Sequence, residues 1–104
     1  MDIAFLERNI SRKIAVYGET HDETVYLKNQ LGGLLLDAGQ YVEAINLFKK
    51  VLDEQILKYG KNHPNISIYW HNYGEALSVS ERHNDALSAY SEALIVDKAT
   101  LGDD

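Results

Sequence analysis

Histidines and neighbouring carboxylates are the residues of this sequence whose types could bind a metal or transfer protons. The histidines form no His-x-x-x-His pair on one helical turn, and no Glu-x-x-His arrangement accompanies them, so the usual spacing of helical metal ligands is missing. His21 and His63 hold equivalent places, each at the start of an expected helix, which favours a structural role. We therefore predict no metal site at the four histidines, which are His21, His63, His71 and His83.

The acidic and nucleophilic residues also lack a catalytic setting. Asp53-Glu54 and Asp103-Asp104 are expected on solvated faces or at the end of the sequence, where nothing would force two pKa values apart. No serine lies in a Gly-x-Ser-x-Gly setting, and Gly32-Gly33 lies inside an expected helix rather than in a phosphate-binding loop. Cysteine is absent. We predict no catalytic residue, no cofactor and no enzymatic activity.

Length, composition and charge are those of one soluble domain. The sequence has 104 residues, of which 45% are hydrophobic and 25% charged. No apolar run approaches the roughly 20 residues that cross a bilayer, and the first residues do not resemble a secretory signal. The formal net charge of −6 makes nucleic acid and anionic membranes poor partners. We expect a cytoplasmic, intracellular protein that binds neither.

Apolar residues at helical spacing predict five helices and an all-α fold. Gly18 and Gly60 end two of them, while Pro64 suits the first position of another, preceded by Asn62 or His63 as its cap. The apolar stripes also contain Tyr17, Tyr59, Tyr73 and Tyr90, which we expect to pack in the core. The expected helices span residues 2–17, 22–37, 41–59, 64–80 and 84–101, with Asn84 capping the last.

The sequence repeats itself with a 42-residue period. Gly18, Gly60 and Gly102 are evenly spaced at this interval. Most of the matching positions are small or apolar, which is typical of a repeat that packing maintains. The same shift relates Tyr17 to Tyr59, His21 to His63, Gly32 to Gly74, Leu35 to Leu77, Ala44 to Ala86, Phe48 to Tyr90 and Leu52 to Leu94.

Two adjacent glycines inside one expected helix need a physical reason. Gly32 and Gly33 each cost about 1 kcal/mol relative to alanine at a helical position. We expect Gly32 to face Ala44, so that two small residues let the helices 22–37 and 41–59 approach closely.

At Trp70-His71-Asn72-Tyr73-Gly74 and the small and aromatic residues that follow, the sequence resembles the tetratricopeptide repeat. It departs from that pattern at Lys28, where the family often has tryptophan, and at Val51, where it prefers alanine. The 42-residue spacing and the Gly-Lys-Asn-His-Pro junction look like the lengthened kinesin-light-chain type. The positions that carry the resemblance are Leu31, Gly32, Leu35, Ala44, Phe48, Trp70, Gly74, Leu77, Ala86, Tyr90 and Ala93.

The resemblance implies a right-handed superhelix of antiparallel helix pairs, each made of an A helix and a B helix. Residues 1–104 would form one domain: a B-type helix of a partial repeat in 1–19, then repeats in 20–61 and 62–104. We expect the chain to be an excerpt of a longer array. The last helix, with Ile95, Val96 and Leu101, would then lack a covering neighbour, so we also expect self-association through it.

In such stacks the A helices line a concave groove that binds extended or helical peptides. Asn29, Gln30, His71 and Asn72 would form a polar strip able to donate to and accept from a peptide backbone. Gly33 would leave a hollow where the equivalent residue of the next repeat is a glutamate. The groove positions that the resemblance implies are Tyr26, Asn29, Gln30, Gly33, Leu36, Asp37, Ile68, His71, Asn72, Glu75, Ser78 and Val79.

The function that follows is protein–protein interaction, as a scaffold or adaptor. The strip contains Asp37 and Glu75 but no lysine or arginine, so a neutral or basic peptide segment is favoured over an acidic one. Two alternatives remain open: a structural spacer or self-association element within a larger solenoid, and a regulatory array attached to an enzyme or signalling domain.

Overall fold

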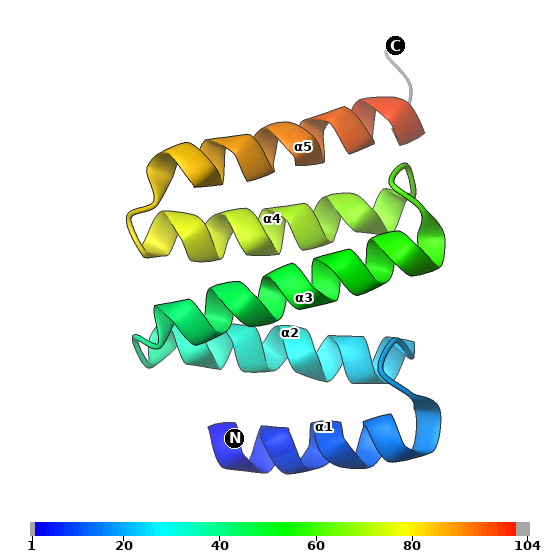
Figure 1. Cartoon of the computed structure of the whole chain (residues 1–104), viewed down its shortest axis with the longest axis vertical. Helices are drawn as coiled ribbons and strands as arrows, with labels where there is room; N and C mark the ends of the chain where they lie inside the picture. Colours follow the sequence, from blue (N-terminus) through cyan, green and yellow to red (C-terminus); the bar gives the residue numbers. More distant parts are fainter. Residues whose placement is uncertain (1, 102–104) are drawn as a thin grey trace.

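Five α-helices follow one another in a computed structural model that describes residues 2–101 (Figure 1). The all-α fold with five sequentially packed helices is confirmed. Gly102, the third glycine of the 42-residue spacing, and Asp103-Asp104 lie outside the described residues. The helices are α1 Ile3–Tyr17, α2 Asp22–Asp37, α3 Tyr41–Tyr59, α4 Pro64–Val79 and α5 His83–Leu101.

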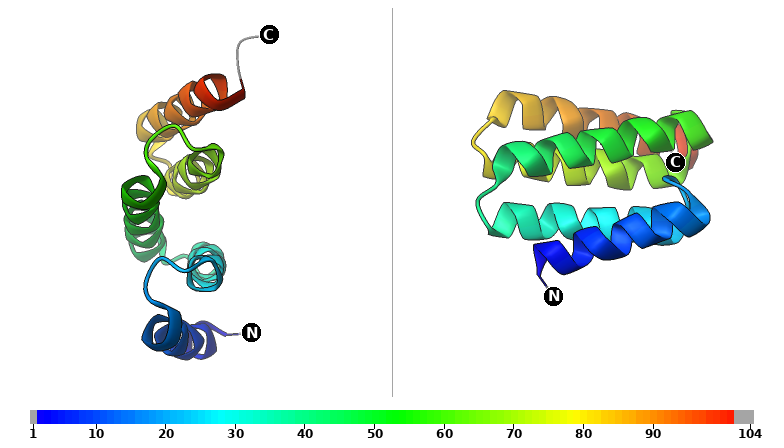
Figure 2. Two further views of the ribbon diagram at one scale, coloured as in Figure 1. Left: turned by 90° about the vertical axis from the view of Figure 1, so that its right-hand side faces the viewer. Right: turned by 60° about the horizontal axis from the view of Figure 1, so that its bottom comes forward.

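The helices form two layers of a curved stack that measures 43 × 32 × 18 Å. Figure 2 shows α2 and α4 in one layer and α1, α3 and α5 in the other, with the stack curving toward the side of α2 and α4. The core lies between the layers, because the apolar stripe of each helix meets that of its neighbour. The outer surface of α2 and α4 is therefore the concave face of the protein.

The connections after α1 and α3 are built alike. In each, a glycine ends the helix and a histidine caps the next one. Nδ1 of His21 accepts from the N–H of Glu23 at 3.2 Å, and Nδ1 of His63 accepts from the N–H of Asn65 at 3.1 Å. Each histidine thereby satisfies an N–H of the first turn that has no partner within its helix. This is the structural role predicted for the pair.

Two tyrosines hold these capping histidines in place. The rings of Tyr17 and His21 stack with their centroids 4.4 Å apart, and those of Tyr59 and His63 repeat the contact at the same distance. The predicted core position of Tyr17 is wrong, since 49% of this residue is exposed and its ring is engaged at the junction. The other two tyrosines of the predicted stripes, Tyr73 and Tyr90, are half-buried against the core.

The turns that follow α2 and α4 also repeat. Gly39 has a φ of 77°, and Glu81, its equivalent in the next repeat, adopts the same left-handed conformation with a φ of 66°. In both turns two backbone N–H groups donate back to carbonyls of the preceding helical turn, as in a Schellman motif. The second turn leads directly into α5 at His83. The expectation that Asn84 caps this helix is therefore wrong, because Asn84 lies inside its first turn.

The closest approach of α2 and α3 is made by Gly32 and Phe48. A Cβ on Gly32 would lie 2.3–2.8 Å from three atoms of the Phe48 ring. Ala44, the small residue expected to allow this approach, is fully buried one turn earlier on α3. Gly74 faces Tyr90 in the same way, with a Cβ position 2.8 Å from the ring. In each repeat a ring rather than a methyl group fills the space that the glycine leaves.

A buried ion pair joins the turn before α2, α2 itself and α3. The side chain of Lys28 is only 5% exposed, and its Nζ donates to the carboxylate of Glu19 at 2.6 Å, to the Glu19 carbonyl at 3.0 Å and to Glu54 at 3.3 Å. All three ammonium donors therefore have an acceptor. The hydrogen bond from Lys28 lowers the pKa of Glu19 below its ordinary value. The expectation that Glu54 lies on a solvated face is wrong, since its side chain is 21% exposed and turned to Lys28.

The second repeat has an apolar cluster in the corresponding place. Trp70 and Val96, the equivalents of Lys28 and Glu54, pack with Leu52 in one hydrophobic cluster. Val96 is only 4% exposed, so the expectation that it is uncovered is wrong.

We expect Lys28→Met to lower the free energy of unfolding by about 1–3 kcal/mol, because it leaves Glu54 partly buried without its cation. The double variant Lys28→Met/Glu54→Met should recover most of this loss, because an apolar pair of similar size can replace a buried ion pair. Urea unfolding followed by circular dichroism measures both. Lys49→Met, which removes an exposed ion pair of α3, is the control and should change stability by less than about 0.5 kcal/mol. Equal losses in the single and double variants would contradict this account.

Candidate functional site

A hollow of about 270 Å³ opens on the concave face between α2 and α4. Gly33 leaves part of it open, because no atom lies within 4 Å of the place that a Cβ would take. α3 contributes Phe48, whose ring also fills the space at Gly32. We call this the Gly33 hollow; its lining residues are Tyr26, Asn29, Gln30, Gly33 and Leu36 of α2, Phe48 of α3, and Asn72 and Glu75 of α4.

The Gly33 hollow contains three side-chain amides, which donate and accept hydrogen bonds, and one carboxylate. Oδ1 of Asn29 is buried and has no hydrogen-bond partner among the described residues. Nε2 of Gln30 donates to the Tyr26 hydroxyl at 2.9 Å, which leaves the Gln30 carbonyl oxygen unused by that bond. Glu75 is exposed and forms no ion pair with any lysine or arginine within residues 2–101. No lysine or arginine lines the hollow.

A second hollow, of about 310 Å³, adjoins the first along α2. Gln30 and Gly33 line both hollows, and Asp37 and Leu6 line only the second. Leu6 on α1 is the equivalent of Phe48 on α3, one repeat later in the sequence. The two hollows therefore occupy corresponding places one repeat apart, and we call the second the Asp37 hollow.

The structure brings seven of the twelve predicted groove positions together in the Gly33 hollow and one, Asp37, in its neighbour. Ile68 is 55% exposed on α4, and the ring of His71 lies 5.8 Å from that of Tyr90. Neither of these two residues lines either hollow, and the same holds for Ser78 and Val79. The seven positions together are Tyr26, Asn29, Gln30, Gly33, Leu36, Asn72 and Glu75. Their part in binding stays a prediction.

Phe48 is the lining residue that the sequence did not indicate as part of the groove. Its place on an apolar stripe assigned it to the core, and it is indeed 5% exposed. The signal that could have revealed its second role is the glycine pair of α2. Gly32 lets the ring through to the concave side, and Gly33 leaves the space above it open.

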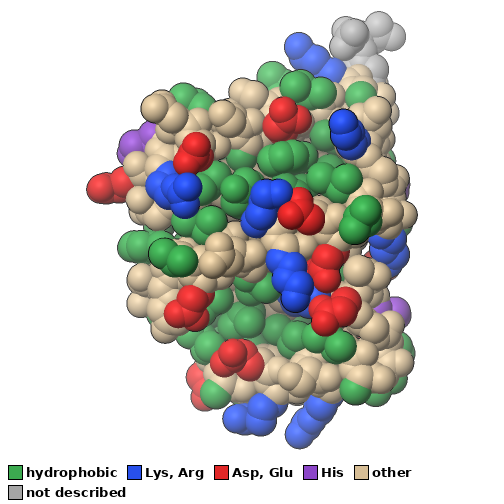
Figure 3. Space-filling view, in the orientation of Figure 1, with side chains coloured by type: hydrophobic (Ala, Val, Ile, Leu, Met, Phe, Trp, Pro, Cys, Tyr) green, Lys and Arg blue, Asp and Glu red, His purple; other side chains and the backbone are tan. Residues whose placement is uncertain are grey.

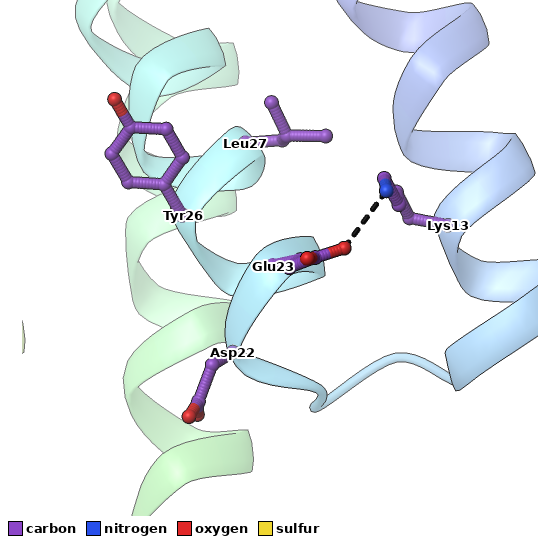
Figure 4. A pocket seen from close by; sticks show the side chains of 5 residues that line it. All are labelled: Lys13, Asp22, Glu23, Tyr26 and Leu27. Carbon is purple, nitrogen blue, oxygen red and sulfur yellow. Dashed lines mark hydrogen bonds and ion pairs between the residues drawn. The ribbon is translucent and has the colours of Figure 1, made fainter.

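A further cleft, of about 360 Å³, lies between α1 and α2, and Figure 4 shows the side chains that line it. Lys13 of α1 reaches Glu23 of α2 at 2.8 Å, and this contact raises the pKa of Lys13 and lowers that of Glu23. Tyr26 is the one predicted groove residue here. The cleft is therefore bridged by an ion pair and is largely separate from the groove residues.

The opposite face of the stack has a different character. Figure 3 shows the side on which α3 lies in front of α2, where Lys, Arg, Asp and Glu side chains are spread among apolar patches. α5 is different again, because Leu87, Leu94 and Ile95 are 64%, 55% and 57% exposed. Their apolar surface has no covering helix among the described residues.

The family model described as tetratricopeptide repeat matches residues 23–99. The chain belongs to the tetratricopeptide repeat family. No curated protein matches its sequence. The match covers nearly all of α2, all of α3 and α4, and nearly all of α5, the elements that carry both helix pairs and the Gly33 hollow.

Tetratricopeptide repeats in general mediate protein–protein interactions and are typically non-catalytic. The positions that carry the resemblance to this family serve packing, because every one of them is buried or half-buried. None of the helices in residues 2–101 has the length and apolar character to cross a membrane. No group of three potential metal ligands comes together in the same range.

The two glycines of α2 provide a matched test of packing. Gly33→Ala should raise the free energy of unfolding by up to about 1 kcal/mol, because alanine favours the helix and the new methyl group meets open space. Gly32→Ala has the same propensity gain but drives a methyl group into the Phe48 ring. Its stability should therefore be about 1–3 kcal/mol below that of Gly33→Ala. Thermal and urea unfolding measure the difference, and equal stabilities would contradict the close contact.

Proposed function

We propose that this chain is a protein-interaction module that binds a peptide or a partner helix along the concave face of α2 and α4, as part of a scaffold or adaptor. The observation that carries this proposal is the Gly33 hollow: it combines one open helical position, an apolar ring and several amide groups on one face. Side-chain amides both donate and accept, so they suit the backbone of an extended peptide.

The charge of this face favours a neutral or basic segment. Glu75 and Asp37 lie in the two hollows without a lysine or arginine in either lining. An acidic peptide would meet these carboxylates and the net charge of −6, whereas a basic peptide would be attracted by both.

We expect Asn29→Ala/Asn72→Ala to weaken the binding of groove peptides by about tenfold, because two amide contacts worth roughly 0.5–1.5 kcal/mol each are lost. Peptides are first selected against the wild-type chain from a random display library, and their affinities are then measured by fluorescence anisotropy. The control Asn46→Ala/Asn84→Ala removes two exposed asparagines outside the hollow and should leave affinity unchanged. Circular dichroism checks that helicity is kept. If the selected peptides bind both double variants equally well, the groove assignment is wrong.

Self-association through α5 is the second candidate, and a comparison between equivalent positions favours it. Leu87 and Leu94 are 64% and 55% exposed, whereas Ile45 and Leu52, their equivalents on α3, are 7% and 0% exposed. On α3 these positions lie against neighbouring helices, so the same stripe on α5 is an apolar surface suited to packing against another helix. Under this proposal the segment acts as an assembly element within a solenoid.

We expect the wild-type chain to associate as its concentration rises, and Leu94→Glu to shift it toward the monomer, because the charge would be buried in the contact. Sedimentation velocity over a wide range of concentrations measures the change. Leu57→Glu is the matched control: Leu57 is 89% exposed on α3, and its replacement should leave association unchanged. A wild-type chain that is strictly monomeric at high concentration would count against this candidate.

Three finer expectations also remain part of the proposal. The kinesin-light-chain type rests on the 42-residue period and the Gly-Lys-Asn-His-Pro junction. We also propose a cytoplasmic location, with a regulatory array attached to an enzyme or signalling domain as the alternative role.

A further inference from the structure

We propose that the Gly33 hollow binds an arginine side chain of the peptide. The inference rests on the proposed function, because it assigns one side chain of the partner to one place in the groove. Its volume of about 270 Å³ lies just below the roughly 300–1,000 Å³ of pockets that enclose drug-sized molecules, so it suits a single long side chain.

Side-chain oxygens of the lining can accept further hydrogen bonds. Oδ1 of Asn29 is buried without a partner among the described residues, and a buried polar atom of this kind is normally satisfied. Gln30 directs an N–H to the Tyr26 hydroxyl and keeps its carbonyl oxygen available. A ligand group with several donors therefore suits these oxygens and the carboxylate of Glu75. Among side chains, guanidinium and ammonium groups have this property.

The electrostatics of the hollow call for a cation. Glu75 is exposed at its edge, and within residues 2–101 no lysine or arginine forms an ion pair with it. Asp37 lies in the adjoining hollow, which shares Gln30 and Gly33 with this one. A cation placed above Gly33 would thus share the hollow with Glu75, with Asp37 in the adjoining hollow and no lysine or arginine in either lining.

The shape and the apolar lining favour arginine over lysine. Phe48 and Leu36 provide apolar surface for an aliphatic stem, and the open position at Gly33 removes the side chain that would block it. A guanidinium group is planar, carries five donors and can stack on an aromatic ring, so it can donate to more than one acceptor of the hollow at once. An ammonium group is a compact charge with three donors and matches fewer of these groups.

The first experiment titrates the isotopically labelled chain with three small probes and follows its backbone amide resonances. The probes are the Nα-acetyl methylamides of arginine, lysine and citrulline, the last being the neutral analogue of arginine with nearly the same shape. We expect the arginine probe to shift the resonances of Asn29, Gln30, Gly33 and Asn72, with a dissociation constant on the order of 1 mM. The lysine probe should bind more weakly, and the citrulline probe should cause no saturable shift. Equal shifts from arginine and citrulline would overturn the proposal.

Two variants locate the site, and a third is their control. Glu75→Gln should weaken the arginine probe by about three- to fivefold and reduce the effect of salt on its affinity. Gly33→Leu should fill the hollow and abolish the shifts while the helix is kept. Glu92→Gln removes an exposed carboxylate of α5 and should leave the affinity unchanged. Unchanged binding to both Glu75→Gln and Gly33→Leu would overturn the assignment of this hollow.

The peptides selected against the groove separate this inference from the proposed function. If both hold, the selected peptides share an arginine whose replacement by citrulline weakens binding in the wild-type chain but not in Glu75→Gln. Groove peptides without a required arginine, together with no response to the arginine probe, would overturn the inference and leave the groove function standing. A response to the arginine probe with no peptide bound at the groove would overturn the proposed function instead.

Discussion

The contact between a glycine on one helix and an aromatic ring on the next is the constraint on which this structure depends. Gly32 has room for no side chain because the ring of Phe48 occupies the space, and Gly74 and Tyr90 repeat the arrangement. Packed interiors leave few voids, so the distance between paired helices follows from the size of these rings. For α2 and α3 the ring is that of Phe48, and the separation of these two helices determines where the concave surface lies.

The same contact links packing to the candidate site. Phe48 is a core residue by its burial, yet it also lines the Gly33 hollow. Gly33 lowers the helix propensity of α2, but no close contact requires a glycine there, because no atom lies within 4 Å of the position that a Cβ would take. Positions that break a local rule with no structural compensation are often functional. Here the break lies beside a buried amide oxygen that has no partner among the described residues. These features support a ligand at this place better than packing alone does.

The two repeats share a backbone plan but not the chemistry of their cores. Where the second repeat joins its helices through Trp70 and Val96, the first uses Lys28 and Glu54, with Glu19 completing the ion pair. An ion pair of this burial must satisfy every donor, and Lys28 does so. The family pattern thus specifies the space to be filled, while different chemistries can fill it. The hydrogen bonds of the Lys28 ammonium group are directional, so they fix α2 relative to both the preceding turn and α3.

Much of the fold was determined by local sequence. Glycines, a single proline and apolar periodicity placed all five helices within about one residue of their observed bounds, because these signals act over a few neighbouring residues. The 42-residue period then gave the pairing, since equivalent positions must pack alike. Tertiary structure alone decided the rest. It placed the ring of Phe48 against Gly32, drew Glu54 from the surface to Lys28, buried Val96 and turned Tyr17 toward His21. Each of these contacts depends on which helix lies beside the residue. Sequence periodicity predicts the helix face on which a residue lies, but it does not predict which residue of another helix contacts it. The hollow at Gly33 depends on both kinds of information. The sequence shows that position 33 has no side chain, and only the tertiary structure places residues of α3 and α4 beside it.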